Sequence, residues 1–191
     1  APLLKSILPM YGLEAYAAEK RQAGAHPISR FLLCALSVLS NGWGLNDVLE
    51  CGQTGFLGIT QEETDKLCAY CEGADVRGDA LKRPLRYPRG VTEEELDALE
   101  ESREKIAAPL LALQKDLSRA QTADDTIQAI LKLLEGVKAY ETLENMRDEL
   151  NHIGMTSEAQ DCAQVWNALM ETLDQLHTLL GGRAVPAKIV Q

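Results

Sequence analysis

The sequence has few aromatic residues and no long hydrophobic run. Phe, Trp and Tyr make up only 5% of its 191 residues, although 46% of the residues are hydrophobic. No stretch of about 18 apolar residues and no secretory signal segment is visible, so neither a membrane-spanning helix nor a signal peptide is expected. The five cysteines, an odd number, indicate reduced thiols rather than a disulfide framework. These features predict a cytoplasmic protein with no membrane partner.

The motifs of common catalytic and metal sites are also missing. The chain has no GxxxxGK(S/T) phosphate loop, no GxGxxG motif and no Asp/Glu-x-Lys arrangement typical of metal-dependent nucleases. Cys68 and Cys71 have the spacing of two zinc ligands, but no second pair completes a four-ligand site. His26, His152 and His177 are far apart in the sequence, and each is expected at the surface or at a helix end. The sequence therefore predicts no catalytic residue, no metal and no cofactor in this chain.

Positive charge is scarcer than negative charge, and one short segment is rich in it. The chain carries 29 acidic and 19 basic side chains, a net charge of -10, which argues against a self-sufficient nucleic-acid-binding domain. One short segment runs against this balance, because it combines Tyr87 and a single acid, Asp79, with five basic residues: Arg77, Lys82, Arg83, Arg86 and Arg89. Such a loop could hold phosphates and stack a base. Alternatively, its basic side chains pair with carboxylates of neighbouring helices.

What the chain does contain is rich in leucine and alanine, which favour helix over strand. Pro27 stands at a favoured first-turn position, and the apolar residues after it recur at helical spacing until Asn41-Gly42. Further helices are predicted to begin at Thr122 and at three capping boxes, Thr60 with Glu63, Thr92 with Glu95, and Ser157 with Gln160.

Other local signals complete the helical prediction. Asn46 is expected to cap a short helix that runs to about Gly52, and another helix should span about 138–152. Pro109 falls inside the long helix that follows Thr92, so that helix is expected to kink or break near Ala107–Ala108. Residues 2–11 indicate a short helix, and residues 13–19 are at best a short strand. The predicted fold is mostly α, with about seven or eight helices.

The segment from 73 to 91, rich in Gly, Pro and Arg, is the one long irregular stretch, and it separates a shorter N-terminal helical group from a longer C-terminal one. The chain opens inside an apolar helical pattern and stops on "AVPAKIVQ", where a new segment begins. We therefore expect the sequence to be an excerpt of a longer protein.

Three blocks of the sequence are more specific than these general patterns. "APLLKSILPMYGLEAYAAEKRQAGAHPISRFLLCALSVLS" is followed by "NGWGLNDVLECGQTGFLGITQEETDKLCAYC", and "AQVWNALMETLDQLHTLLG" lies near the end. In their order and spacing these blocks resemble the middle of the B subunit of bacterial ATP-dependent helicase–nucleases, the AddAB or RexAB type. The resemblance covers nearly the whole chain.

This resemblance implies a domain organisation. Residues 1–26 would be the edge of a second RecA-like helicase domain, a small α/β remnant at the N-terminus. Residues 27–182 would form an inserted all-helical domain with a sub-boundary near 73–91, and residues 183–191 would start the next segment. The helix beginning at Pro27 would then mark where the chain passes from an α/β domain into a helical one.

The resemblance also implies a function for the parent protein. The parent would process broken double-stranded DNA for recombinational repair, together with an A-type helicase–nuclease motor subunit. Its ATP, Mg²⁺ and iron–sulfur cluster would be held outside this chain, which would serve as a scaffold along the DNA path. The chain departs from the family pattern at Gly24 and Ala25, where related helicases have a nucleotide-sensing arginine, and at Gln53, where the family usually has Lys. The alternative is a stand-alone acidic helical protein–protein adaptor.

Overall fold

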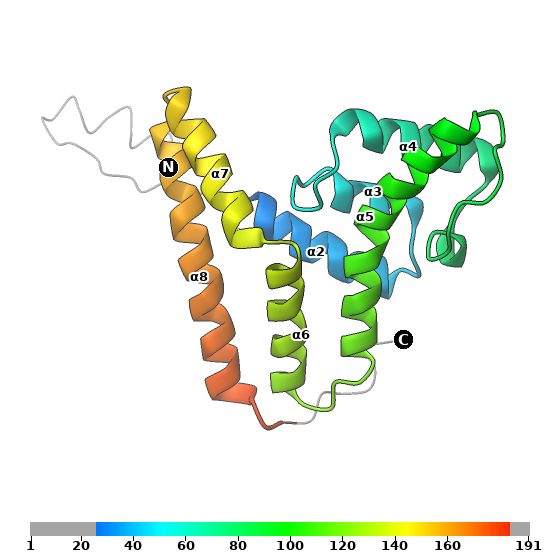
Figure 1. Ribbon diagram of the computed structural model, residues 1–191. Helices are drawn as coiled ribbons and strands as arrows, with labels where there is room; N and C mark the ends of the chain where they lie inside the picture. Colours follow the sequence, from blue (N-terminus) through cyan, green and yellow to red (C-terminus); the bar gives the residue numbers. More distant parts are fainter. Residues whose placement is uncertain (1–25, 184–191) are drawn as a thin grey trace, which may run out of the picture.

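The computed structural model describes residues 26–183, and this part of the chain contains seven α-helices, one 3₁₀ turn and no strand (Figure 1). The prediction of a mostly helical protein is confirmed. The helices, in chain order, are α2 (Pro27–Ser40), α3 (Leu45–Gly52), α4 (Gln61–Ala74), α5 (Glu93–Leu117), α6 (Ala123–Gly136), α7 (Ala139–His152) and α8 (Thr156–Leu180). The 3₁₀ turn η3 covers Gly78–Ala80. The helix predicted over 2–11, the strand over 13–19 and the RecA-like remnant lie outside the described residues.

Helix α2 begins as its sequence predicts. His26 is the N-cap, with its ring Nδ1 3.4 Å from the Ile28 backbone N–H, and Pro27 occupies the first turn. The helix buries a single face, on which Ile28, Phe31 and Val38 have no solvent exposure. Pro27 therefore starts an amphipathic helix whose apolar face enters the core.

The turn after α2 is held by a buried tryptophan. Gly42 and Trp43 both adopt positive φ, 70° and 62°, a conformation that is costly for a large side chain. Trp43 is fully buried, and its indole Nε1 donates to Gln114 Oε1 on α5 at 3.3 Å. Burial of the largest side chain type in the protein thus offsets the backbone strain.

Two of the three predicted capping boxes are present. The side chains and backbones of Thr60 with Glu63, and of Thr92 with Glu95, bond reciprocally at the starts of α4 and α5. Thr122, predicted only as a helix start, forms a third box with Asp125. These caps satisfy backbone N–H groups that the first turn leaves without helical partners.

The box predicted at Ser157 and Gln160 is wrong. Helix α8 already begins at Thr156, and its N-cap Met155 makes no side-chain capping bond. The α7–α8 turn is closed by the backbone instead, since Met155 N–H donates to the Leu150 carbonyl at 2.8 Å and Gly154 takes φ 82°. A tight backbone turn leaves no place for a side-chain cap.

The cap predicted at Asn46 is also wrong. Gly44 is the N-cap of α3, without a side-chain bond, and Asn46 lies inside the first turn. The chain enters α3 earlier because Trp43 N–H donates back to the Val38 carbonyl at 2.8 Å, which closes the preceding turn. The side chain that supports the start of α3 is Asn41, whose Nδ2 donates to Asp47 Oδ2 at 3.1 Å.

Pro109 does not break α5, which runs without interruption over 25 residues. Proline removes one backbone donor and crowds the preceding turn, an effect that bends a helix. Figure 1 shows the first half of α5 inclined to its second half. Continuity is maintained because Ile106, Ala107 and Leu110, on both sides of the proline, are buried in the core.

Helix α5 connects two groups of helices (Figure 1). Helices α2, α3 and α4 contact it, and so does α6, which in turn contacts α7 and α8. The approach of α3 is close: a Cβ added to Gly52 would lie 3.0 Å from Ile106 Cδ1. A single apolar core runs through both groups. The domain boundaries predicted from the sequence stay predictions.

The described helices were expected not to span a membrane. None of them combines the length and the apolar composition that a membrane-spanning helix needs.

Candidate nucleic-acid interface

The segment between α4 and α5 carries all five predicted basic residues, and a buried arginine on α5 holds it in place. The Arg103 side chain is only 3% exposed, and its Nη1 donates to the Leu81 carbonyl at 3.1 Å. Its Nε and Nη2 bind both oxygens of Glu100, at 2.8 and 2.6 Å, and these bonds raise the pKa of Arg103. Glu100 in turn accepts the Leu85 backbone N–H at 2.7 Å.

The first part of the loop packs against the turn between α2 and α3. Leu81 is buried, and Lys82 Nζ lies 5.5 Å from the centre of a Trp43 ring, within cation–π range. Lys82 also bonds Asp79 at 2.7 Å. The pKa of Asp79 lies below its ordinary value, chiefly because of this bond and also because Arg83 adds positive charge nearby. Lys82 therefore stabilises the loop.

The second part of the loop is tied to α4. The Tyr70 hydroxyl donates to the Tyr87 carbonyl at 2.6 Å, and Arg89 N–H donates to the same carbonyl at 2.8 Å across Pro88. Arg89 Nη1 also donates to the carbonyl of Ala74, the last residue of α4, at 3.3 Å. Although it lacks helix and strand over most of its length, the segment is fixed at several points.

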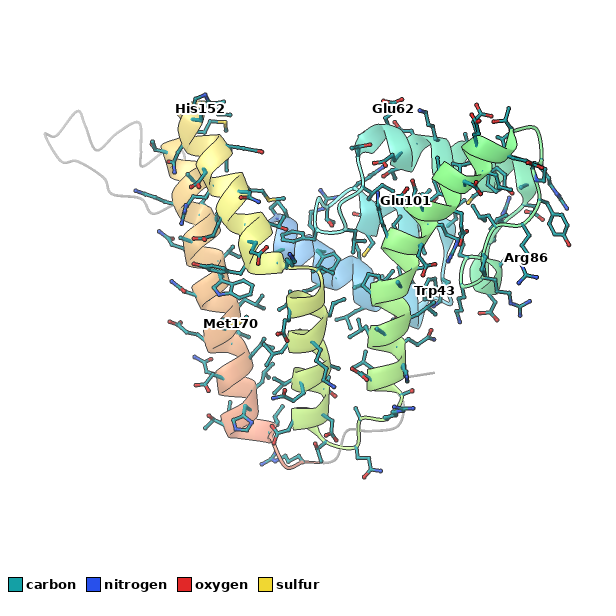
Figure 2. All side chains as sticks on the ribbon, viewed as in Figure 1. Trp43, Glu62, Arg86, Glu101, His152 and Met170 are labelled. Carbon is teal, nitrogen blue, oxygen red and sulfur yellow. The ribbon has the colours of Figure 1, made fainter. Side chains whose placement is uncertain are left out.

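The five basic residues consequently fall into two groups. Arg77 pairs with Asp75 at 3.0 Å, while Lys82 and Arg89 make the contacts above. Arg83 and Arg86 are exposed, and within residues 26–183 neither side chain makes an ion pair or a hydrogen bond. Figure 2 shows Arg86 at the outer edge of the molecule. The carboxylates that pair with the basic residues, Asp75 and Asp79, belong to the segment itself rather than to the faces of neighbouring helices.

A groove between α5, α6, α7 and the turn over residues 55–58 is a second place where a ligand could bind. Its volume is about 730 Å³, and small side chains such as Ala108, Pro109 and Ala112 line much of it. Three lysines also line it, but each pairs with a carboxylate: Lys105 with Glu101, Lys132 with Asp116, and Lys138 with Glu141. With its cations paired, the groove is a poor anion site.

The turn in which Gln53 departs from the family pattern lies beside this groove. Gln53 is exposed, whereas Thr54 is buried and its hydroxyl donates to the Cys51 carbonyl at 2.7 Å. Thr54 Oγ1 is therefore committed to the local turn.

The cysteines and histidines occupy structural positions. Burial raises the pKa of Cys71 to about 11, and burial also raises the pKa of Cys68. His26 caps α2, His152 ends α7, and His177 Nδ1 lies 2.6 Å from Asp124 Oδ1. Among the described residues, no group of three or more His, Cys, Asp and Glu side chains is placed to hold a metal ion.

Arg103 is the residue of this interface that sequence reasoning missed. Its position inside a run of charged residues, "EESREK", is typical of a solvated helix face. The available signal was helical spacing, since Arg103 lies four residues after Leu99 and seven after Leu96, on the apolar face of α5.

Comparisons with known proteins were made for the whole chain. No family model matches it. It is 26% identical to a Clostridium botulinum (strain Loch Maree / Type A3) protein named as the B subunit of an ATP-dependent helicase/deoxyribonuclease, over 97% of this chain and 17% of the relative. Proteins of the same name from Symbiobacterium thermophilum and Bacillus velezensis are 28% and 26% identical, over 98% and 99% of this chain. The chain spans only 17–18% of the length of these relatives. The resemblance to the B subunit of bacterial ATP-dependent helicase–nucleases is thus confirmed over nearly the whole chain.

Proposed function

We propose that this chain is a non-catalytic helical part of the B subunit of an ATP-dependent helicase/deoxyribonuclease, acting in double-strand break repair by homologous recombination in the cytoplasm. The observation that carries the proposal is similarity along nearly the whole chain to proteins of that name from several bacteria. ATP, Mg²⁺ and an iron–sulfur cluster would be bound elsewhere in the parent protein.

Within the parent, we assign the chain a scaffold role next to an A-type motor subunit. Exposed apolar side chains support a packing role, among them Leu176 and Leu179 on the last turns of α8. This part of the proposal is tested by co-purification of the intact parent protein with an A-type partner. If the coding sequence around this chain lacked a phosphate loop upstream and a cysteine-rich nuclease segment downstream, the stand-alone adaptor would be favoured.

The loop from Arg77 to Arg89 is proposed to contact DNA phosphates in the assembled complex. Support comes from its fixed backbone and from the exposure of Arg83 and Arg86, whose side chains make no ion pair or hydrogen bond within the described residues. Phosphate contacts of this kind supply affinity that depends on salt but not on sequence.

The test replaces Arg83 and Arg86 together by Ala in the intact parent protein. Lys82 is left in place because its contacts with Trp43 and Asp79 are structural. DNA binding should weaken, and the slope of log K against log salt should flatten by about 0.9 per lost duplex phosphate contact, or about 0.7 on a single strand.

A charge-matched control replaces two exposed lysines outside the loop, Lys66 and Lys132, by Ala. This double variant should keep both the affinity and the slope. An Arg83→Ala/Arg86→Ala variant that binds DNA as the control does would refute the proposed contact.

A further inference from the structure

We propose that the loop is a binding site for single-stranded nucleic acid, with Tyr87 as a platform on which one unpaired base stacks. The proposal rests on the proposed contact between this loop and DNA, and it names the kind of strand that the loop recognises. Its starting point is Tyr87, an aromatic side chain that is 70% exposed between Arg86 and Arg89.

The backbone of Tyr87 is held while its ring remains free. Its carbonyl accepts two hydrogen bonds, from the Tyr70 hydroxyl at 2.6 Å and from Arg89 N–H at 2.8 Å. Pro88 restricts the Tyr87 backbone further, since the proline ring fixes its own φ and disfavours the α region for the residue before it. A base that stacks on Tyr87 would therefore order little more than two side-chain torsions, which keeps the entropic cost of binding low.

The cations around Tyr87 suit a nucleic-acid strand. Arg86 directly precedes it and Arg83 lies one short segment earlier, both exposed and without an ion pair in the described part of the chain. Arg86 is directed outward at the edge of the molecule (Figure 2). An aromatic face beside exposed guanidinium groups is the combination by which proteins bind single strands without sequence preference.

Single strands are favoured over duplex for a geometric reason. Bases in a duplex are paired and stacked on each other, so one exposed tyrosine reaches a base face only where the stack is open. The described loop also presents no helix or long ribbon of the kind that enters a major groove; its one regular turn, η3, has three residues. Duplex DNA would still meet Arg83 and Arg86 through its phosphates.

The test uses the full chain at low ionic strength, where phosphate contacts are strongest. The probes are a fluorescent oligothymidylate and a hairpin duplex of the same nucleotide length. Tyr87→Ala should weaken binding to the single strand by about 5- to 150-fold, the range that corresponds to about 1–3 kcal/mol for one base–aromatic stack. Tyr87→Phe should bind like the wild type because the ring remains. Neither variant should change duplex binding.

A second, local measurement uses an oligothymidylate in which one base is 5-iododeoxyuridine. Ultraviolet light should cross-link this base to Tyr87, as mapped by mass spectrometry, and Tyr87→Ala should remove the cross-link. Tyr140→Ala, at an exposed tyrosine on α7, is the matched control and should leave single-strand binding unchanged.

The outcomes separate this inference from the proposed phosphate contact. If Arg83→Ala/Arg86→Ala weakens binding but Tyr87→Ala does not, the phosphate contact stands and the stacking platform is refuted. Equal weakening on single strand and duplex by Tyr87→Ala would also refute it. If wild type fails to bind the single strand, the stacking platform is refuted. If, in addition, Arg83→Ala/Arg86→Ala leaves DNA binding by the intact parent protein unchanged, both proposals fail and an acidic protein surface becomes the better partner for the loop.

Discussion

Arg103 and Arg147 have the same local sequence setting on different helices. Each has a Glu three residues before it and an acidic residue directly after it, and each pairs with both. The Arg103 side chain is 3% exposed and also donates a hydrogen bond to the Leu81 carbonyl, whereas the Arg147 side chain is 36% exposed. The two clusters have the same charge pattern, but only the buried Arg103 also holds the loop between α4 and α5.

This difference gives a matched pair of variants. Arg103→Met should lower the free energy of unfolding by about 2–3 kcal/mol, since it removes the cation that pairs with Glu100 and the donor to the Leu81 carbonyl. Arg147→Met should lower the free energy of unfolding by clearly less than Arg103→Met does, as expected for an exposed pair. Urea unfolding followed by circular dichroism measures both. Equal costs for the two variants would contradict the anchoring role of Arg103.

His26 makes the stability of α2 depend on pH. Burial lowers the pKa of His26 below its unfolded value of about 6.5, an effect that Asp161 on α8 opposes. The capping arrangement also requires an unprotonated Nδ1 as acceptor. The His26 imidazole therefore takes up its proton at a higher pH in the unfolded chain than in the folded one. As the pH falls below about 6.5, the free energy of unfolding should decrease, until the pH has passed the lower pKa of His26 in the folded protein.

The measurement compares wild type with His26→Asn, which keeps an N-cap acceptor but does not titrate near neutrality. Between about pH 7.5 and pH 5.5, the wild type should lose more stability than the variant. The two proteins differ only at residue 26, so titrating groups that do not interact with His26 cancel in the comparison. Parallel pH profiles would show that His26 carries none of this dependence.

At the scale of elements, local signals located most helix starts. The boxes at Thr60 and Thr92 form as predicted because both partners lie within one helical turn, so no distant residue is needed. The box at Ser157 and Gln160 has the same pattern, yet a backbone turn closed by Gly154 and Met155 takes its place. Which of two local solutions forms depends on how α7 and α8 meet.

The two kinds of helix start respond differently to loss of a hydroxyl. Thr92→Ala should lower the free energy of unfolding by about 1 kcal/mol, the usual cost of an N-cap. Ser157→Ala should change it by less than about 0.5 kcal/mol, since Ser157 caps nothing. Thermal or urea unfolding provides the comparison. A cost at Ser157 as large as that at Thr92 would restore the capping box predicted from the sequence.

For the whole molecule, the net charge of -10 opposes binding to the phosphates of DNA. The loop has five basic side chains, but α5 follows it with Glu93, Glu94 and Glu95. At physiological salt we expect the chain alone to bind duplex DNA with a dissociation constant of about 10⁻⁴ M or weaker. Fluorescence anisotropy measures this constant.

We also expect the chain neither to hydrolyse ATP nor to cut DNA. Turnover assays on the purified chain check this prediction. Turnover that a substitution in this chain abolishes would contradict it.

The sequence by itself determined the helical class, the start of α2 at Pro27 and the caps at Thr60 and Thr92. These features depend on residues only a few positions apart, which meet as soon as one helical turn forms. The wording of three blocks also carried the resemblance to the B subunits of helicase–nucleases.

Tertiary structure alone decided the burial of Arg103, the use of Lys82 against Trp43 and the continuity of α5 through Pro109. It also separated Arg83 and Arg86 from the other basic residues of the loop. The physical reason is that these outcomes depend on contacts between residues far apart in the chain, such as Arg103 with Leu81 and Trp43 with Gln114. Residues such as Arg103 and Arg147 have similar charge patterns and helix propensities in the sequence. Only the packing of α5 against its neighbours determines which of these side chains is removed from water.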